Sequence, residues 1–288
     1  MDAALYRERC GPRLRACVFW ATVFSESSEF ELNLPFSSKN SSTNWLLLDI
    51  EGTTTSVDFV YKTLFPFASA QVEGYLYRHS ADPEIKRLIS ELRAEQAADA
   101  SKDPQIGVWM RGTADEEIVT ASVYVRHLIA LDRKTTPLKT LQGKIWEEGF
   151  RSGELKGHVY EDVPNAFARW SAEGKKIAIF SSGSVQAQRL LFGHSVAGDL
   201  TKYIEAYFDT TTGPKREAAS YAAIGNALGV AAESVLFVSD VPAELDAARE
   251  AGMQTALMAR PGGAASNDTR HVRIEGFAGL KADRRSES

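Results

Sequence analysis

Residues 45–54 read Trp-Leu-Leu-Leu-Asp-Ile-Glu-Gly-Thr-Thr, an apolar run followed by two acids and a turn. The run Trp45–Ile50 is too short for a helix and lacks the alternation of a half-buried strand, so it predicts a strand that is buried on both faces. Four later runs share this character: Lys176–Ser181, Ala206–Asp209, Ser234–Asp240 and Gln254–Met258. We therefore expect a parallel sheet.

Helical patterns separate the later runs. They cover residues 184–194, 214–228 and 242–251, and Pro214 and Pro242 stand where a helix favours proline, in its first turn. Strands that alternate with helices in this way build an α/β fold with a doubly wound, Rossmann-like parallel sheet.

A long interval between the first and second strand runs shows helix signals and no comparable strand run. Its helix starts are marked by Asp82-Pro83, by Thr113 with Glu116, and by Thr136-Pro137. We expect residues 57–157 to form an inserted α-helical cap domain, and residues 44–56 and 158–275 to form the α/β core.

The two ends of the chain differ from this pattern. Both cysteines, Cys10 and Cys17, lie near the start, and the absence of thiols elsewhere is typical of a reducing compartment. Arginines before the apolar run 16–24 imitate an export signal, but no clear cleavage site follows. We expect a disordered leader over residues 1–43, a tail over residues 276–288 and a cytoplasmic protein, with a nuclear pool as well in a eukaryote.

Charge and hydropathy narrow the classes of partner. Lys and Arg total 33 against 38 Asp and Glu, which gives a net charge of −5, so the chain has no electrostatic reason to bind nucleic acid. No apolar stretch approaches the roughly 20 residues of a membrane-spanning helix. We expect a small-molecule substrate, no nucleic-acid or membrane partner, and a monomer.

Polar side chains stand at the carboxyl ends of three predicted strands. Asp49 and Glu51 follow the first, Ser181 and Ser182 end the second, and Asp240 ends the fourth. The carboxyl ends of parallel strands meet at one rim, where ligands of α/β proteins bind. Acids gathered there repel one another, so they predict a bound hard cation, and Mg²⁺ is the commonest such partner of phosphates.

Two further residues extend this cluster. Lys215, at the expected start of a helix, adds a mobile positive charge to the same rim. Glu244, one helical turn beyond Asp240, is a candidate acceptor that would orient Lys215 or a metal-bound water. Each residue alone is more often a cap, a polar loop or a solvated charge. Their succession on neighbouring strand ends favours a site that handles phosphate.

The order Asp-x-Glu-Gly-Thr, Ser-Ser-Gly, Pro-Lys and Ser-Asp-x-x-x-Glu resembles the four motifs of the haloacid dehalogenase-like phosphatases. Glu51 departs from that pattern, because most of the superfamily has an aspartate there. Within the superfamily, residues 49–54, 141–146, 153–158 and 239–248 resemble the enolase-phosphatases of methionine salvage. The resemblance spans roughly residues 45 to 260.

The resemblance implies a bifunctional, Mg²⁺-dependent enzyme with one ion per chain. Such an enzyme enolises 2,3-diketo-5-methylthiopentyl-1-phosphate and then hydrolyses it to the acireductone 1,2-dihydroxy-3-keto-5-methylthiopentene. The implied nucleophile, which becomes an aspartyl-phosphate, is Asp49. The phosphate ligands are Lys215 and the hydroxyl and backbone N–H groups of Ser181 and Ser182, and the metal ligands are Asp49, Asp240 and the Glu51 carbonyl. We take the Glu51 side chain as the acid for the leaving oxygen.

Several points stay open at this level. The enolisation base is unassigned, and Glu51 is our hypothesis because it reaches further than an aspartate. Alternatives are a phosphatase of another small ester, a dehalogenase, a phosphomutase and a non-catalytic phosphate- or Mg²⁺-binding module. Trp109, Tyr124, Trp146 and Phe150 are expected to form the core of the helical region rather than a methylthio pocket. His127 is expected to be structural. For His158, a structural role and a substrate contact are equally expected.

Overall fold

The computed structural model describes residues 43–103, 105–110, 112–261 and 268–280. The expected leader falls outside this part except for its last residue, as do residues 281–288 of the expected tail. The strands are β1 (Trp45–Leu48), β2 (Lys176–Phe180), β3 (Ile204–Phe208), β4 (Val235–Ser239), β5 (Gln254–Met258) and β6 (Val272–Ile274). None of the described helices combines the length and apolarity needed to cross a membrane.

The helices fall into two groups along the chain. Between β1 and β2 lie α1 (Val57–Phe59), a π-helical turn (Val60–Leu64), α2 (Phe65–Arg78), α3 (Pro83–Ala100), α4 (Ala114–Ala130), α5 (Thr136–Ser152) and α6 (Asp162–Ala172). After β2 come α7 (Val185–Gly193), α8 (Ala218–Leu228) and α9 (Pro242–Glu250), with 3₁₀ turns at Thr201–Tyr203, Ala232–Ser234 and Phe277–Gly279. We call residues 57–157, which contain α1 to α5, the helical segment.

The six strands form one parallel sheet in the order β3-β2-β1-β4-β5-β6. Leu47 of β1 lies between Ala178 of β2 and Phe237 of β4. The chain first winds outward from β1 through β2 to β3 and then crosses back to β4, which reverses the direction of winding. The expected doubly wound parallel sheet is confirmed, and its reversal point falls between β1 and β4.

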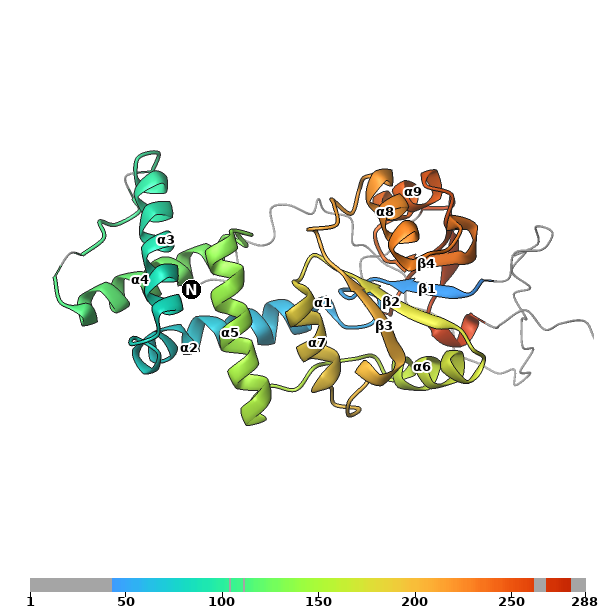
Figure 1. Cartoon of the computed structure of the whole chain (residues 1–288), viewed down its shortest axis with the longest axis horizontal. Coiled ribbons are helices and arrows are strands. Elements are labelled where there is room, and N and C mark those ends of the chain that lie inside the picture. Colours follow the sequence, from blue (N-terminus) through green and yellow to red (C-terminus); the bar gives the residue numbers. More distant parts are fainter. Residues whose placement is uncertain (1–42, 104, 111, 262–267, 281–288) are drawn as a thin grey trace, which may run out of the picture. The chain divides into compact units, whose positions relative to one another are not determined.

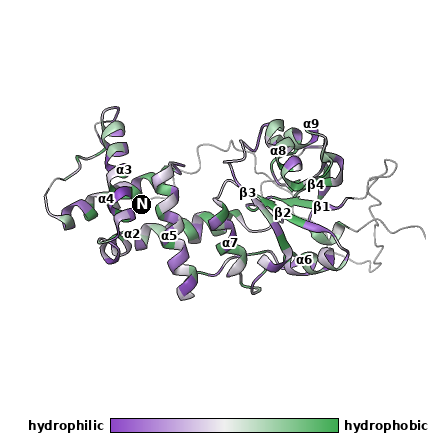
Figure 2. Ribbon diagram, in the orientation of Figure 1, coloured by the Kyte–Doolittle hydropathy of each residue, from purple (hydrophilic) through white to green (hydrophobic). Residues whose placement is uncertain are grey.

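Both faces of the sheet are buried, as the continuous apolar runs predict. Leu46 and Leu48 point to the face covered by α6 and α7, and Trp45 and Leu47 point to the face covered by α8 and α9. Figure 1 shows α8 and α9 together on one side of the sheet and α6 on the other. In Figure 2 the strands carry the hydrophobic colour that this double burial requires.

Three details differ from the sequence predictions. β6 is an additional strand of three residues, too short to produce a pattern. α8 begins at Ala218, so Lys215 lies in a turn before the helix and not in its first turn. Phe277, within the expected tail, is fully buried and packs against Trp170 at a ring distance of 5.1 Å.

The helical segment has an apolar core of its own. The buried members of this core come from α2 to α5 and the chain around Trp109; they include Val72, Leu76, Ile85, Leu88, Trp109, Tyr124, Val125, Leu128, Leu141 and Ile145. Thr113 and Glu116 form the predicted capping box at the start of α4, with both reciprocal hydrogen bonds present. The segment therefore packs around its own centre while the sheet packs around two others.

The chain passes twice between the sheet and the helical segment, and His158 joins the two connections. Its Nδ1 atom accepts a hydrogen bond from the Ser56 N–H at 3.1 Å and lies 2.9 Å from the Thr55 hydroxyl. Burial lowers the pKa of His158, which keeps Nδ1 available as an acceptor. Nearby, the Tyr160 N–H donates to the Thr54 carbonyl. The outgoing and returning connections thus lie side by side.

Candidate functional site

Asp49 is held at the carboxyl end of β1 by the backbone around it. Its N–H continues the ladder to the Val238 carbonyl of β4 at 3.0 Å, and its side chain is buried. The following chain folds back at once, because the Thr54 and Thr55 N–H groups both donate to the Ile50 carbonyl at 2.9 Å. This tight loop keeps the carboxylate at the reversal point of the sheet.

Lys215 connects Asp49 with Glu244. Its ammonium nitrogen lies 2.5 Å from the Asp49 Oδ1 atom and 2.7 Å from the Glu244 Oε2 atom, and its side chain is 9% exposed. The turn that carries Lys215 is fixed by hydroxyls of α8: Tyr221 donates to the Lys215 carbonyl and Ser220 to the Pro214 carbonyl, both at 2.7 Å. The ammonium is therefore rigidly placed between two carboxylates.

Ser239, at the end of β4, completes this network. Its hydroxyl lies 3.0 Å from the Glu244 carboxylate and 3.4 Å from the Asp49 Oδ2 atom, and it accepts the Val241 N–H at 3.1 Å. Asp49 Oδ1 is thus bound to Lys215, whereas Oδ2 has only a long contact with Ser239. Among the described contacts, Oδ2 is therefore held less tightly than Oδ1 and is the better placed of the two oxygens to react.

Asp240 lies against the loop that follows Asp49. A Cβ atom added at Gly52 would stand 2.1 Å from the Asp240 Oδ2 atom, and Gly52 itself has a φ of +74°. Both facts require glycine, because the left-handed backbone and the close approach each exclude a side chain. The structure therefore brings the ends of β1 and β4 together at the rim.

The carboxylates of this rim outnumber its cations. Burial, and then the charges of Asp49 and Glu244, raise the pKa of Asp240 to about 7. Burial and Asp49 likewise raise the pKa of Glu244 to about 7 and that of Glu51 above its ordinary value. Burial works against the Lys215 charge, but Asp49 and Glu244 outweigh it and raise the pKa of Lys215. A further cation would relieve this repulsion.

The donor atoms suit a hard divalent cation. Within the described residues, no group of three or more His, Cys, Asp or Glu side chains is arranged to enclose a metal. The predicted ligand set needs only two carboxylates, those of Asp49 and Asp240, with the Glu51 carbonyl as a third oxygen. Mg²⁺ typically takes one or two carboxylates and keeps several waters, so this set fits it.

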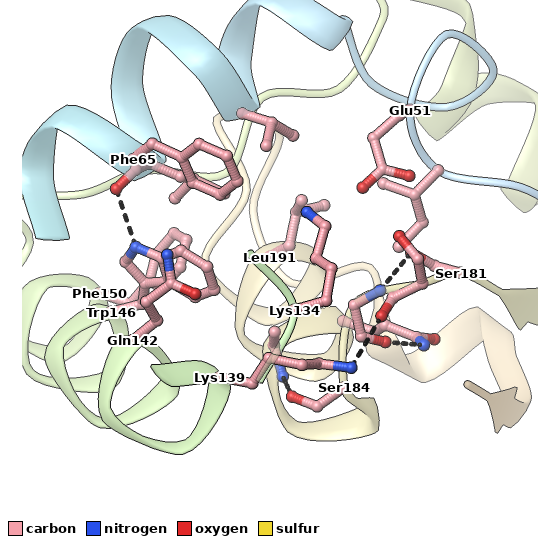
Figure 3. Close-up of a pocket in the computed structure, with 17 residues that line it drawn as sticks. Glu51, Phe65, Lys134, Lys139, Gln142, Trp146, Phe150, Ser181, Ser184 and Leu191 are labelled. Atoms are coloured by element: carbon pink, nitrogen blue, oxygen red, sulfur yellow. Dashed lines mark hydrogen bonds between the residues drawn. The ribbon is translucent and has the colours of Figure 1, made fainter. Parts of the chain in front are cut away.

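A pocket opens beside these residues (Figure 3). The sheet side contributes Glu51 and the loop 181–184 that follows β2, and the helical segment contributes the other wall. The lining side chains of the helical segment are Val60, Leu64, Phe65, Lys134, Lys139, Gln142, Trp146 and Phe150. The pocket therefore has one charged, polar end near the rim and one apolar end within the helical segment.

Ser181 and Ser182 occupy different positions in this pocket. The Ser181 side chain is buried, and its hydroxyl accepts the Gly183 N–H at 3.1 Å, which leaves its own proton free to donate to a ligand. The Ser181 N–H bonds to the Phe208 carbonyl of β3 at 3.2 Å, so our expectation that it could bind phosphate is wrong. Ser182 is exposed, and its carbonyl accepts a hydrogen bond from Lys139 at 3.2 Å.

Arg260, which follows β5, anchors the loop after Asp49. It is not among the residues that the sequence predicts. Its Nε and Nη2 atoms donate to the Thr53 carbonyl at 3.0 and 2.8 Å, and Nη1 bonds both Asp162 oxygens at 2.8 Å. The guanidinium also stacks on Tyr160 and Phe277. We call this group the Arg260 clamp; no local motif marks an arginine after a strand, so only the fold reveals it.

The histidines and aromatic residues are distributed as follows. His127 lies on α4 and His158 at the connection described above, and neither is among the lining residues of the pocket. Trp109 and Tyr124 belong to the core of the helical segment, as expected. Trp146 and Phe150 do line the pocket, so their assignment to the core alone is wrong.

Known proteins are similar to this chain over the whole site. A model of the family described as haloacid dehalogenase-like hydrolase matches residues 43–252. The enolase-phosphatase E1 of Synechococcus elongatus is 57% identical over 219 residues, which cover 76% of this chain and 90% of that protein. The enolase-phosphatase E1 of Drosophila grimshawi is 45% identical over 243 residues, which cover 83% and 95%.

A solved structure is similar as well. The crystal structure of the UTR4 protein (unknown transcript 4 protein) of Saccharomyces cerevisiae superposes with a TM-score of 0.67 at 35% sequence identity, and the match covers 83% of this chain and 99% of that one. The residues matched by the family model run from before Asp49 to beyond Glu244. The similarity therefore includes all the predicted site residues.

Substitution of Gly52 by alanine tests the close contact with Asp240. We expect Gly52→Ala to lower phosphate release from a small ester by about 100-fold, because the new methyl group displaces the Asp240 carboxylate from the rim. Gly174→Ala is the matched control, since Gly174 has the same φ of +74° but no atom within 4 Å of an added Cβ. Both variants should lose about 1 kcal/mol of unfolding free energy; equal activity in both would contradict this account.

Substitution of Arg260 by lysine tests the clamp. A lysine keeps the charge but cannot bond the Thr53 carbonyl and both Asp162 oxygens at once, so we expect Arg260→Lys to lower the free energy of unfolding in urea by about 2 kcal/mol. Arg270→Lys, an exposed arginine paired with Asp246 and Asp268, should change it by less than about 0.5 kcal/mol. If Arg260→Lys were as stable as Arg270→Lys, the hydrogen bonds to the Thr53 carbonyl would not contribute to the free energy of unfolding.

Proposed function

The chain belongs to the haloacid dehalogenase-like hydrolases and, within them, to the enolase-phosphatases, and we propose that both reactions of such an enzyme take place at the rim around Asp49. The substrate is 2,3-diketo-5-methylthiopentyl-1-phosphate of the methionine salvage pathway, and the products are an acireductone and phosphate. The observation that supports this site best is the Lys215 ammonium, held between Asp49 and Glu244 where the sheet reverses.

In the phosphatase step the Asp49 carboxylate attacks phosphorus. Its Oδ2 atom, which has only the long contact with Ser239, forms the new P–O bond, and the bond from phosphorus to the ester oxygen breaks. Glu51, which lines the pocket, gives its proton to the departing oxygen. A water molecule, deprotonated by the same carboxylate, then attacks phosphorus and releases Asp49 and inorganic phosphate.

The remaining polar groups neutralise the charge of the phosphate. Lys215 has a third N–H beyond its bonds to Asp49 and Glu244, and the Ser181 hydroxyl has a free proton at the end of β2, on the same sheet side. Both are fixed by the fold before the substrate arrives, so little reorganisation is needed during the reaction. Glu244 acts on Lys215 and not on the phosphate, because its carboxylate holds the ammonium in place.

We propose one Mg²⁺ per chain, bound by the carboxylates of Asp49 and Asp240 and by the Glu51 carbonyl. When bound, it supplies positive charge to the phosphate oxygens and polarises the dione, which acidifies the neighbouring C–H group. Enolisation moves that carbon-bound proton to a base, and we assign this role to Glu51, the carboxylate that lines the pocket.

We propose that the helical segment, residues 57–157, serves as a cap over the core formed by residues 44–56 and 158–275. The apolar end of the pocket, where Phe65 and Trp146 stack at 6.4 Å, would receive the methylthio end of the substrate. Enclosure between the two walls would exclude water from the rim. We further propose that the enzyme works as a monomer in the cytoplasm.

Removal of the nucleophile is the first test. Asp49→Asn should lose phosphate release from the diketone phosphate by at least about 10⁴-fold, because an amide cannot form the phosphoryl-enzyme. Asp199→Asn changes an exposed aspartate that precedes β3, and it should retain activity within about twofold. A stable, folded Asp49→Asn protein that still turns over would exclude Asp49 from this role.

Metal removal is the second test. After treatment with a chelator, phosphate release should fall to background, and added Mg²⁺ should restore it. Mg²⁺ alone should also raise the melting temperature of the wild-type protein, because a ligand that binds only the folded state stabilises it. The same addition should leave the melting temperature of Asp240→Asn unchanged; an equal rise in both proteins would place the ion elsewhere.

A further inference from the structure

Helix α5 presents three chemically different side chains to the pocket. Lys139, Gln142 and Trp146 line the pocket and follow one another at spacings of three and four residues, which places them on one face of the helix. In Figure 3 the Lys139 side chain extends from α5 toward Ser181 and Ser184, while Gln142 and Trp146 lie on the side of Phe65. The face thus changes from a cation through an amide to an aromatic ring.

Lys139 has an unusual electrostatic environment. It is half-buried, and its one hydrogen-bond partner among the described residues is the Ser182 carbonyl, with no carboxylate within ion-pair distance. The other half-buried Lys and Arg side chains described in the helical segment each pair with a carboxylate: Arg93 with Glu117, Arg126 with Glu73, Arg133 with Glu95 and Asp99, and Lys144 with Glu84. The Lys139 ammonium lies at an exposed contact and is not engaged by a carboxylate of the described residues, so it can bind a negatively charged atom of a ligand.

The position of Lys139 on its helix also disfavours a purely structural role. It lies in the first turns of α5, where the helix dipole is positive and a cation is destabilising, and no acidic residue occupies the first turn. Asp209 is near enough to respond to the charge of Lys139, but its oxygens already accept hydrogen bonds from Thr211 and Val185. The ammonium is therefore available to a negatively charged atom in the pocket.

Gln142 has unused hydrogen-bonding capacity. Its side chain is 5% exposed, and none of the described residues forms a hydrogen bond with its amide. Among the described residues, the fully buried polar atoms that lack a partner do not include this amide, so the amide is open toward the pocket that Gln142 lines. A ligand with an oxygen acceptor beside α5 would satisfy it.

The order of these groups matches the order of groups in the proposed substrate. Lys139 touches the loop of Ser181 and Ser182, next to the proposed phosphate position. Gln142 lies about one helical turn further along α5, and Trp146 lies another turn on, stacked on Phe65. Beyond a phosphate in that position, the first carbonyl, the second carbonyl and the apolar thioether would meet Lys139, Gln142 and Trp146 in that sequence.

We propose that Lys139 and Gln142 bind the two carbonyl oxygens of the dione, and that Lys139 stabilises the enolate formed when the neighbouring C–H group is deprotonated. This assignment rests on the proposed function. It makes Lys139 a catalytic residue of the enolisation step alone, and Gln142 a residue that selects substrates with a second oxygen next to the first.

The proposed step balances as follows. The C–H bond beside the carbonyl breaks and its proton passes to Glu51, while its electron pair forms the C=C bond. The π pair of the carbonyl moves to the oxygen, which receives the N–H hydrogen bond of Lys139 at the moment when its charge is greatest. Glu51 returns its proton to water, and the oxygen takes one from water to give the enol.

The two reactions can be measured separately. The phosphonate analogue of the diketone phosphate cannot be hydrolysed, so deuterium exchange of the methylene next to its carbonyl, followed by NMR, reports enolisation alone. Pentyl phosphate lacks both carbonyls, so phosphate release from it reports the hydrolytic step alone. We expect Lys139→Met to slow exchange by about 100-fold and Gln142→Leu by about tenfold, and in each variant the loss of kcat/KM for pentyl phosphate should be several times smaller than the loss of exchange.

Three further variants complete the experiment. Lys144→Met makes the same chemical change on the same helix at a lysine paired with Glu84, and it should leave both rates within about twofold of wild type. Lys139→Arg keeps a positive charge and should recover a large part of the exchange rate. Glu51→Gln should abolish exchange if Glu51 is the base.

Each outcome has one meaning. Loss of exchange by tenfold or more in Lys139→Met, with a loss of pentyl phosphate hydrolysis several times smaller, supports the assignment. A smaller loss of exchange, or an equal loss of both rates, overturns it. If the wild-type protein hydrolyses pentyl phosphate but does not exchange the analogue, the proposed enolase function itself fails, and this inference fails with it.

Discussion

The site depends on one ammonium ion placed between carboxylates that would otherwise repel one another. Lys215 bonds Asp49 and Glu244 within a buried rim, and it allows charged groups to remain where the sheet reverses its winding. Burial, and then the charge of Asp49, raise the pKa values of Asp240 and Glu51 despite the nearby Lys215. An excess of acidic groups over cations is thus built into the rim, and a divalent cation would relieve the repulsion among them.

The two walls of the pocket divide the chemistry between them. The rim of the sheet holds the groups that we propose to act on phosphorus, and these are positioned by strand ends and short loops. The helical segment supplies side chains that meet the rest of a ligand, and its own apolar core lets it present them rigidly. Because the two walls come from separate parts of the chain, a change in substrate preference can arise on α5 without disturbing Asp49 or Lys215.

The sequence predicts those parts of the molecule that local pattern controls. The strand runs and the residues at their ends, from Asp49 to Asp240, could be found because buried parallel strands are continuous apolar runs. Pro214 suits both a turn and the first turn of a helix, so the sequence predicts a helix start where the structure has the turn before α8. The sequence also predicts the Ser181 N–H as a phosphate ligand, whereas it bonds to the Phe208 carbonyl of β3. Lys139 and Gln142 carry no local signal; their importance appears only when pairing and burial across the whole chain are known.

The Arg260 clamp has a consequence for synthesis of the protein on the ribosome. Arg260 follows Thr53 by 207 positions, so the loop after Asp49 is among the first parts of the described chain to emerge and among the last to be anchored. A nascent chain that ends before Arg260 already contains every catalytic motif, yet the loop after Asp49 lacks its fastening to β5 and α6. Anchoring of the loop after Asp49 by Arg260 therefore has to wait until β5 has been synthesised.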